Sequence, residues 1–530
     1  MIFILDLGKK YKLRIDIKKI DNDNFEVKVL SGTTTLHKVN LNDNIYKKMT
    51  NKRISKLKLI ELSFEFLLKR EPNTSIMPAF ELSIINNYFP EFENEITIKI
   101  KELILKVLVI GSGGREHAIC WGISNNKKID KIYCAPGNAG ISNIAEIVNI
   151  KTDNLEGLVN FAKKENIDFT IVGPEQPLSL GIVDLFRKNN LLVFGPSKYA
   201  SQLESSKEFS KLFMKRNNIP TASFESFTNY ENARSYLDNS PIPIVIKADG
   251  LASGKGVKVC FSKDEAFSFL KEVMQDKVFS TSGDKVVIES FLKGEEASFF
   301  VFSDGKNILT LDSSQDHKRL LDGDKGPNTG GMGAYSPAPI IDEITRQNIL
   351  NEIVYPVFEG FKKEDFEYTG ILYIGLMIDD KKPSVVEFNC RFGDPETQPL
   401  LFRINSDIFD LFYFTALKKI SDYKLEWKSK TAVSVVLASK GYPASPITGD
   451  EIKNLKEIDL SGDEFIFHAG TKLDRNKIII SGGRVLNVTA LGDTLEEAID
   501  KSYECINKIE TKNLQYRNDI GVKGLLKKAK

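Results

Sequence analysis

Short alternating patterns of apolar and charged residues open the chain. Apolar residues at positions 11, 13, 15 and 17 alternate with charged residues at 12, 14, 16 and 18, which predicts a half-buried strand. Turn-forming residues at 21–24 follow, and Phe25, Val27 and Val29 resume the alternation, so the pattern predicts a β-hairpin. Helical spacing predicts a helix over 55–70 and another within 78–105. Residues 1–105 therefore form an α+β extension, in which no catalytic pattern is found.

A different pattern starts at Lys106. Apolar runs of four or five residues, each ending at or near a glycine, alternate with helical patterns and begin near residues 106, 131, 169 and 191. Such runs are typical of buried parallel strands, whose ligand-facing loops gather at the carboxyl edge of the sheet. We expect a Rossmann-like α/β domain over 106–206.

Mixed patterns fill the remainder. Residues 207–421 open with a helical pattern and continue through strands, a glycine-rich loop and a long polar loop, which predicts a mixed α/β domain. Residues 422–530 contain apolar strand patterns and a terminal helical pattern, which predicts a small β-rich domain. The fold class is therefore α/β with an added α+β extension.

The composition of the chain argues against several classes of function. The 73 basic and 72 acidic residues leave a net charge of +1, which gives no support for nucleic acid or an acidic membrane as a partner of the whole chain. No apolar stretch approaches the ~18 residues of a membrane helix, and the opening apolar run is too short for a signal peptide. The five cysteines form no CxxC pair, so a zinc site or disulfide framework is not expected. We expect a cytoplasmic protein.

A glycine-rich loop follows the strand that carries Lys247. Its glycines, Gly254 and Gly256 among them, would let backbone N–H groups approach phosphate oxygens, and Lys255 adds a point charge. The spacing misses the P-loop pattern by one residue, and Gly256 replaces the hydroxyl that would hold magnesium, which disfavours a P-loop NTPase. Alone, the loop is equally well explained as a turn with a solvated lysine. Lys207 and Lys247 on neighbouring elements favour a triphosphate site.

Acidic residues downstream suggest a nucleotide and metal site. Glu289 ends one strand and Glu296 follows shortly, which fits either an acidic loop or contacts to adenine and ribose. Glu387 and Asn389 are two residues apart, so on a strand both side chains point to one face, and Arg391 follows in the same phase. Carboxylate and amide oxygens suit Mg²⁺, and a guanidinium binds phosphate or carboxylate bidentately. The structural alternative for this strand is a salt-bridge cluster.

Two further segments carry candidate chemistry. The polar loop of 313–339 contains Asp316 and His317 and a glycine-rich stretch, 329–335, that we interpret as a flap excluding water. His317 is either a general base or a hydrogen-bonded loop histidine. Near residue 111, a glycine-rich turn opens a helix without completing G-x-G-x-x-G, so it favours a phosphorylated substrate over NAD. Arg115 would reinforce that site.

Taken together, these motifs resemble one family of ATP-grasp enzymes, the phosphoribosylamine–glycine ligases (glycinamide ribonucleotide synthetases). The resemblance covers about 106–530 and leaves 1–105 without a counterpart. Its most specific segments are GSGGREHAI, IKADGLASGKGV, VIESFLKGEEASF, GPNTGGMGAYSPAP and EFNCRFGDPETQP. It implies a Rossmann-like amino domain, two ATP-grasp lobes and a β-rich carboxyl domain. The implied reaction activates glycine as glycyl phosphate, which the amine of phosphoribosylamine then attacks.

The resemblance also implies roles for individual residues. It implies Arg391, Lys255 and Asp316 as catalytic residues and Mg²⁺ or Mn²⁺ bound by Glu387 and Asn389. The implied ATP ligands are Lys207, Lys247, Gly254, Lys255, Gly256, Glu289 and Glu296, and the implied substrate ligands are Gly113, Gly114, Arg115, Glu116 and Arg391.

Alternatives and partners complete the expectations. The alternatives are another ATP-grasp ligase or carboxylase acting on a different acid such as bicarbonate or formate, an NAD-dependent oxidoreductase, and a non-catalytic nucleotide-binding module. The expected partners are the small molecules ATP, glycine and phosphoribosylamine. We expect a monomer, or a dimer formed through residues 1–105.

Overall fold

The computed structural model describes residues 2–5, 13–31, 33–52, 54–251, 256–510 and 512–528. Tyr11, Gly254 and Lys255 lie outside the described residues. The chain forms two compact units, one made of residues 1–105 with 127–130 and the other of residues 106–126 with 131–530. Within the described residues, no helix has the length and apolar character needed to span a bilayer.

The smaller unit is a five-stranded sheet with helices and its own hydrophobic core. The predicted hairpin is present as β2 and β3, and Phe25, Val27 and Val29 are buried against residues of α2. Helix α2 begins after Ser55, whose hydroxyl accepts a hydrogen bond from the Lys58 N–H. The elements are β1 (Ile2–Leu5), β2 (Leu13–Lys19), β3 (Asn24–Ser31), β4 (Thr33–Asn40), β5 (Ala79–Glu81), α1 (Asp43–Thr50), α2 (Lys56–Arg70), α3 (Ile85–Tyr88) and α4 (Phe92–Leu103).

The larger unit starts with the predicted Rossmann-like sheet, in the order β10-β9-β6-β7-β8. Strand β9 is parallel to both β6 and β10, and every residue of β9 is buried, as the apolar runs predict. The elements are β6 (Leu105–Gly111), β7 (Ile129–Pro136), β8 (Glu146–Ile147), β9 (Phe169–Val172), β10 (Val193–Phe194), α5 (Gly114–Ile123), α6 (Leu155–Glu165), α7 (Glu175–Leu180) and α8 (Ile182–Lys188).

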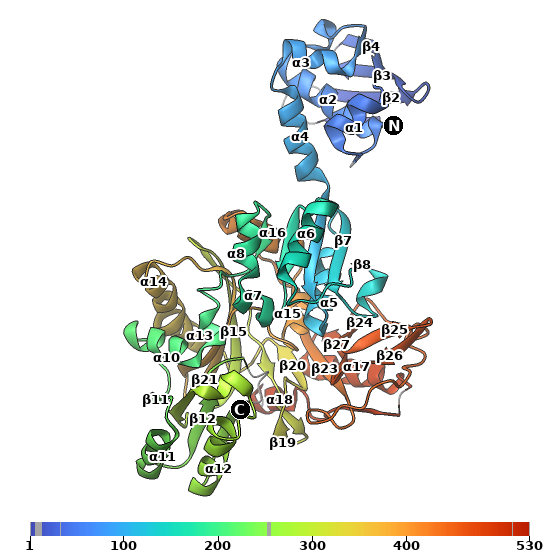
Figure 1. The fold of residues 1–530 in the computed structure, drawn as a ribbon. Coiled ribbons are helices and arrows are strands. Elements are labelled where there is room, and N and C mark those ends of the chain that lie inside the picture. Colours follow the sequence, from blue (N-terminus) through green and yellow to red (C-terminus); the bar gives the residue numbers. More distant parts are fainter. Residues whose placement is uncertain are drawn as a thin grey trace. The chain divides into compact units, whose positions relative to one another are not determined.

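Two four-stranded antiparallel sheets follow, in the orders β11-β14-β12-β13 and β16-β15-β21-β22. Helices α13 and α14 cover the second sheet, where Phe299, Leu372 and Val357 share one core (Figure 1). The elements are α9 (Gln202–Ser205), α10 (Lys207–Arg216), β11 (Phe224–Phe227), α11 (Tyr230–Asn239), β12 (Ile244–Ala248), β13 (Val257–Cys260), α12 (Lys263–Met274), β14 (Val286–Ser290), β15 (Glu295–Asp304), β16 (Ile308–Thr310), α13 (Glu343–Ile349), α14 (Tyr355–Lys363), β21 (Thr369–Asp379), β22 (Lys382–Asn389), α15 (Thr397–Arg403) and α16 (Ile408–Ala416).

The last sheet has the order β17-β20-β23-β27-β24, with β28 paired to β23, and α17 packs against β23 and β27 (Figure 1). Two small hairpins, β18–β19 and β25–β26, stand beside it. The elements are β17 (Gln315–Asp316), β18 (Arg319–Leu321), β19 (Lys325–Asn328), β20 (Gly333–Ser336), β23 (Thr431–Ser439), β24 (Glu464–His468), β25 (Thr471–Asp474), β26 (Lys477–Ile480), β27 (Arg484–Gly492), α17 (Leu495–Asn507), β28 (Leu514–Gln515) and α18 (Val522–Lys528).

The long polar loop predicted over 313–339 is not a loop. Its two ends form β17 and β20, and β20 pairs with β23 inside the last sheet. All four residues of β20 are buried, so the part of the glycine-rich stretch in β20 is a core strand and not the flap we expected. The sequence misled because glycine and polar residues are typical of loops, whereas here neighbouring strands satisfy their backbone groups. The exposed projection is instead the hairpin β18–β19.

Candidate functional site

A cleft of about 1190 Å³ lies in the larger unit and is lined by side chains from several of its sheets. Its walls include Lys247 of β12, Glu296 of β15, Glu387 of β22 and Arg484 of β27. Arg115 joins them from the first turn of α5. A cleft of this volume is large enough for a nucleotide together with small substrates.

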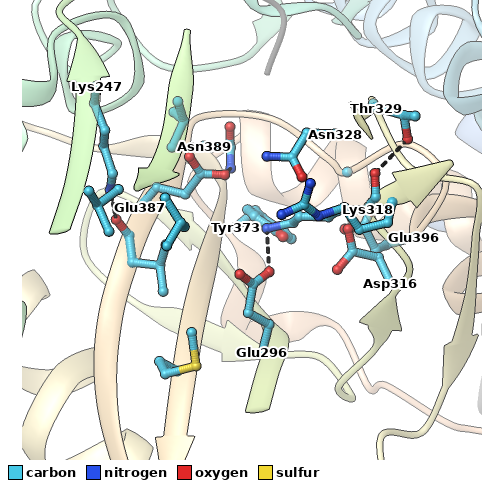
Figure 2. Close-up of a pocket in the computed structure, with 18 of the residues that line it drawn as sticks. Lys247, Glu296, Asp316, Lys318, Asn328, Thr329, Tyr373, Glu387, Asn389 and Glu396 are labelled. Carbon is cyan, nitrogen blue, oxygen red and sulfur yellow. Dashed lines mark hydrogen bonds and ion pairs between the residues drawn. The ribbon is translucent and has the colours of Figure 1, made fainter. Parts of the chain in front are cut away.

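Strand β22 brings the predicted metal ligands to this cleft. Glu387 and Asn389 lie opposite Gly375 and Tyr373 of β21, and both line the cleft (Figure 2). Arg391 follows the end of the strand and also lines the cleft. The acid and the amide therefore share a strand face as expected, and the guanidinium reaches the same cleft from beyond the end of the strand.

Glu387 is a strongly ionised carboxylate. Burial raises its pKa, but the ammonium groups of Lys318, Lys207 and Lys247 and a hydrogen bond from the Asn389 amide outweigh burial and lower the pKa to about 2. The amide nitrogen lies 3.4 Å from Glu387 Oε1. One carboxylate and one amide oxygen fit Mg²⁺ or Mn²⁺, which take hard oxygen ligands and keep several waters. The described residues contain no cluster of three or more histidine, cysteine or acidic side chains suited to a metal.

Two of the predicted phosphate-binding lysines, Lys207 and Lys247, line the cleft, as does Gly256. The Lys247 ammonium lies 2.9 Å from Glu289 Oε1 and donates to the Val386 carbonyl at 3.0 Å. Glu289 Oε2 lies 2.9 Å from the ammonium of Lys211, and all three side chains are buried. Burial and the nearby Lys247 charge lower the pKa of Lys211 to about 8, although Glu289 partly opposes them. The Glu289 carboxylate therefore pairs with Lys247 in the cleft wall and with Lys211, which does not line the cleft; the sequence did not indicate these pairs.

A group of carboxylates surrounds Lys318 on another wall of the cleft. The Lys318 ammonium lies 2.7 Å from Glu296 Oε2, and Asp316 and Glu396 are close by (Figure 2). Burial raises the pKa of Asp316 to about 7; Lys318 opposes this rise, while Glu396, Glu296 and Glu387 add to it. The predicted catalytic residue Asp316 therefore lies in the cleft and exchanges its proton near neutral pH.

His317 lies on the opposite side of the chain from Asp316 and Lys318. It does not line the cleft; its ring is 1% exposed and lies 5.9 Å from the Tyr335 ring in the core. Neither ring nitrogen has a hydrogen-bond partner among the described residues. Burial, followed by the charges of Arg517 and Lys523, lowers its pKa to about 3. The hypothesis of His317 as general base is wrong for this geometry.

Two guanidinium groups converge near the carboxyl edge of the first sheet. Arg391 is paired with Glu204 at 2.8 Å and with Glu175 at 3.2 Å. Both Arg391 and Arg115 donate to the carbonyl of Phe392, at 3.2 and 3.0 Å. Burial would raise the pKa of Glu175, but the charges of Arg391 and Arg115 lower it to about 2. These pairs fix both arginines in the cleft wall.

The glycine-rich turn after β6 opens a helix as predicted, but Glu116 does not contact the cleft as we expected. Its carboxylate accepts a hydrogen bond from the Gly113 N–H at 2.6 Å and another from Arg115 Nε at 2.6 Å, and Glu116 is 2% exposed. Glu116 therefore caps α5 and orients Arg115, and it does not line the cleft. A Cβ at Gly114 would lie only 2.2 Å from the Asn487 amide nitrogen, so a larger residue there would displace that side chain, while a Cβ at Gly113 would lie 2.9 Å from Glu116 Oε2.

Several cleft residues were not predicted individually. Glu175 and Glu204, the partners of Arg391, both line the cleft, as do Asp394 and Arg484. Burial would raise the pKa of Asp394, but Arg484 and then Arg115 lower it. Glu175 stands just after β9, where ligand-facing residues of a parallel sheet gather, so its position was a usable signal. The pairing of Asp394 with Arg484, 90 residues away, had no local signal.

Comparison with known families gives three successive matches. Residues 105–204 match the model of the phosphoribosylglycinamide synthetase N domain, residues 205–397 the model of its ATP-grasp (A) domain, and residues 432–523 the model of its C domain. Residues 1–104 lie outside these matches.

Curated proteins and solved structures are similar over the same region. A phosphoribosylamine–glycine ligase of Neisseria meningitidis is 49% identical over 423 residues, which are 79% of this chain and all of that protein. One of Ralstonia nicotianae is 48% identical over 79% of this chain and 99% of its own. A crystal structure of a phosphoribosylamine–glycine ligase from Thermotoga maritima has a TM-score of 0.68 at 36% identity and covers 78% of this chain and all of that one. A Campylobacter jejuni biotin carboxylase, 15% identical with a TM-score of 0.62 over 79% of this chain and 94% of its own, shares the fold alone.

Proposed function

The chain belongs to the phosphoribosylamine–glycine ligase family, and we propose that its cleft holds ATP, glycine and phosphoribosylamine together. The enzyme joins glycine to 5-phospho-β-D-ribosylamine at the expense of ATP and forms glycinamide ribonucleotide, ADP and phosphate. The family, the fold class and the reaction predicted from the sequence are confirmed.

The reaction proceeds in two steps in this proposal. A carboxylate oxygen of glycine attacks the γ-phosphorus of ATP, the bond to the β-phosphate oxygen breaks, and ADP leaves glycyl phosphate behind. The amine nitrogen of phosphoribosylamine then attacks the acyl carbon, and phosphate departs with the electrons of the broken C–O bond. The amine loses one proton, and Asp316 is placed to accept it, because a base with a pKa near 7 works well at neutral pH.

Fixed positive charges would stabilise the phosphoryl transfer. Lys207 and Lys247 bind the ATP phosphates, and Arg391 contacts the transferred phosphoryl group and the acyl phosphate. Ion pairs, buried in the case of Lys247, hold Lys247 and Arg391 in place before substrate arrives, so little reorganisation accompanies the reaction. Glu296 faces the adenosine, and Gly256 belongs to the phosphate loop whose Gly254 and Lys255 lie outside the described residues.

Glu387 and Asn389 would hold the Mg²⁺ or Mn²⁺ that the ATP-grasp family uses. The ionised carboxylate and the adjacent amide fit this ion, and they leave other positions for water and phosphate oxygens. When bound, the ion supplies charge neutralisation on the ATP phosphates. The protein itself supplies the position, since both side chains come from one buried strand.

The phosphate of phosphoribosylamine binds at the amino end of α5. Gly114 is the first residue of this ten-residue helix, and the helix dipole favours an anion there, although the Gly113 N–H already donates to Glu116. The Arg115 guanidinium adds a full charge, and Glu116 keeps it oriented. Arg115 lines the cleft, so a substrate whose phosphate is bound there would have its amine within the same cleft as the acyl phosphate.

The extension and the setting of the enzyme stay predictions. We predict that the enzyme is a monomer, or a dimer whose subunits contact each other through residues 1–105. All five cysteines lie in described residues and are free, buried thiols, which supports a cytoplasmic, reducing environment.

One observation carries the proposal: β22 directs Glu387 and Asn389 into the cleft that Lys207 and Lys247 also line. The test measures ADP release with purified enzyme, Mg²⁺ and freshly made phosphoribosylamine. Turnover that requires both glycine and phosphoribosylamine supports the proposal. Turnover driven by bicarbonate or formate, without glycine, would identify another ATP-grasp ligase and overturn it.

A further inference from the structure

Residues 517–519 near the carboxyl terminus bind the tip of the hairpin β18–β19 through hydrogen bonds and an ion pair, and we call this set of contacts the grip. The Gly323 N–H donates to Asp519 Oδ2 at 2.8 Å. On the opposite side, Asn518 donates to the Asp322 carboxylate from its backbone N–H at 2.8 Å and from its amide at 3.1 Å. The turn of a short two-stranded hairpin is normally free in solvent, because such hairpins are only marginally stable alone. Here a segment almost 200 residues away in the sequence forms hydrogen bonds with this turn.

Arg517 is the centre of this grip. Its side chain is 1% exposed, and its guanidinium binds both carboxylate oxygens of Asp519 at 2.7 Å. The remaining nitrogen donates to Asp324 Oδ1 at 2.8 Å and to the Arg319 carbonyl at 3.1 Å, and both of these acceptors belong to the hairpin. The Arg517 carbonyl accepts from the Tyr503 hydroxyl of α17 at 2.7 Å, which anchors the segment to the last sheet. A buried guanidinium is tolerated only when its donors are paired, so the hairpin and the segment stabilise each other.

Both ends of the hairpin enter the cleft. The Lys318 carbonyl accepts hydrogen bonds from the N–H and the hydroxyl of Thr329, each at 2.8 Å, which closes the base of the hairpin. Lys318 in turn is paired with Glu296 on the cleft wall. Hairpin residues Arg319, Asp324 and Asn328 line the cleft, together with Lys523, Leu526 and Lys527 of α18. Any displacement of the hairpin therefore changes the surface that faces the nucleotide.

We propose that Arg517 is a positioning residue, which holds the hairpin β18–β19 over the cleft so that Lys318 and Asp316 stay at the reacting groups and water stays out. The predicted effect on catalysis rests on the proposed function. The claim that Arg517 holds the hairpin in place rests only on the hydrogen bonds and ion pairs described above. Without the grip, the hairpin opens, ATP binds more weakly, and water hydrolyses the acyl phosphate before the amine attacks.

Asp324→Asn is the informative variant, because Asp324 lies on the hairpin and its side chain is 38% exposed, so the fold tolerates the change. It removes the charge that pairs with Arg517 and Lys523. Asp463→Asn is the matched control: Asp463 also pairs with two cations, Lys430 and Lys501, and its side chain is 30% exposed, but it does not touch the hairpin.

Limited trypsin digestion tests the grip without reference to activity, since Arg319 and Lys325 are cleavage points in the hairpin. A charge-assisted hydrogen bond contributes enough that its loss should raise the hairpin's cleavage rate about tenfold in Asp324→Asn and leave it unchanged in Asp463→Asn. Equal cleavage rates in the two variants would overturn the proposal.

Kinetics test the catalytic part. Asp324→Asn should raise the KM for ATP and release more than one ADP for each glycinamide ribonucleotide formed, whereas Asp463→Asn should keep the wild-type KM and a ratio of one. A purely structural role would leave that ratio at one in both variants and so overturn the positioning role. If wild-type enzyme forms no glycinamide ribonucleotide at all, the proposed function fails, while the digestion result still decides whether the grip exists.

Discussion

Replacing Asp316 by asparagine should stabilise the protein at alkaline pH while it slows the reaction. In the folded protein, burial and the neighbouring carboxylates raise the pKa of Asp316 from 3.8 to about 7, against the opposing charge of Lys318. Above that pH, folding places a charged carboxylate in a wall that already holds Glu296, Glu387 and Glu396. Asparagine keeps nearly the same shape and is never charged.

The sign follows from proton linkage. Between pH 3.8 and about 7, folded Asp316 keeps a proton that the unfolded chain has released, so its contribution to stability falls as pH rises through this window and is constant above it. Because of a pKa shift of this size, the free energy of unfolding of the wild type should fall by about 2–3 kcal/mol relative to that of Asp316→Asn between pH 5 and pH 8. For a cooperative unit of roughly 420 residues, that corresponds to about 3 °C in melting temperature.

Thermal melts at pH 5, 6, 7 and 8, with EDTA and without ATP, would measure the difference between wild type and variant. Asp463→Asn serves as the control: the Lys430 hydrogen bond, followed by other contacts, lowers the pKa of Asp463, so Asp463 is fully charged throughout this range and the effect of its replacement should not change with pH. A pH-independent gap between Asp316→Asn and wild type would refute the reasoning. With all substrates present, Asp316→Asn should lose about 100-fold in kcat, as expected for a lost general base.

Three further predictions follow from the proposed site. Glu387→Ala should lower kcat at least ~100-fold and weaken Mn²⁺ binding, which electron paramagnetic resonance would measure as more free Mn²⁺ at the same protein and ATP concentrations; an unchanged amount of free Mn²⁺ would place the ion elsewhere. Arg115→Ala should raise the KM for phosphoribosylamine ~10–100-fold and spare the KM for ATP, and a selective loss of ATP affinity would contradict its assignment. A chain that starts at Leu105, the first residue of β6, should keep wild-type kinetics, and light scattering beside the full chain would show whether the extension makes a dimer; loss of activity would show that the ligase needs the extension.

Local patterns were sufficient for most of the fold. The alternation around Val27 and the helix after Ser55 are properties of neighbouring residues, and the structure has both where expected. The buried run of β9 is equally local. The segment 313–339 was misread because its strands are stabilised by partners such as β23, about 100 residues away, and nothing in its own composition reveals them.

The site was predictable where one element presents several groups. Glu387 and Asn389 share a face because strand geometry requires it, whatever the rest of the protein does. Glu289 and Glu116 show the limit of this reasoning. Each was expected to contact a ligand, but Glu116 caps a helix outside the cleft, and Glu289, which does line the cleft, also pairs with two lysines. Residue type and position identify a polar cluster; only distances reveal which polar groups are already paired.

The charges of the cleft argue that nucleotide and metal ion bind cooperatively. Lys207, Lys247 and Lys318 keep the pKa of Glu387 low by compensating for its burial. Phosphate oxygens bound to Lys207 and Lys247 would neutralise the positive charges that stabilise ionised Glu387. They would also bring new negative charge close to Glu387. Glu387 and Asn389 would hold a divalent ion whose positive charge would offset this conflict, so on the proposed function each ligand would strengthen the binding of the other, and linkage would make the effect reciprocal. The arrangement therefore favours the nucleotide–metal complex over either component alone.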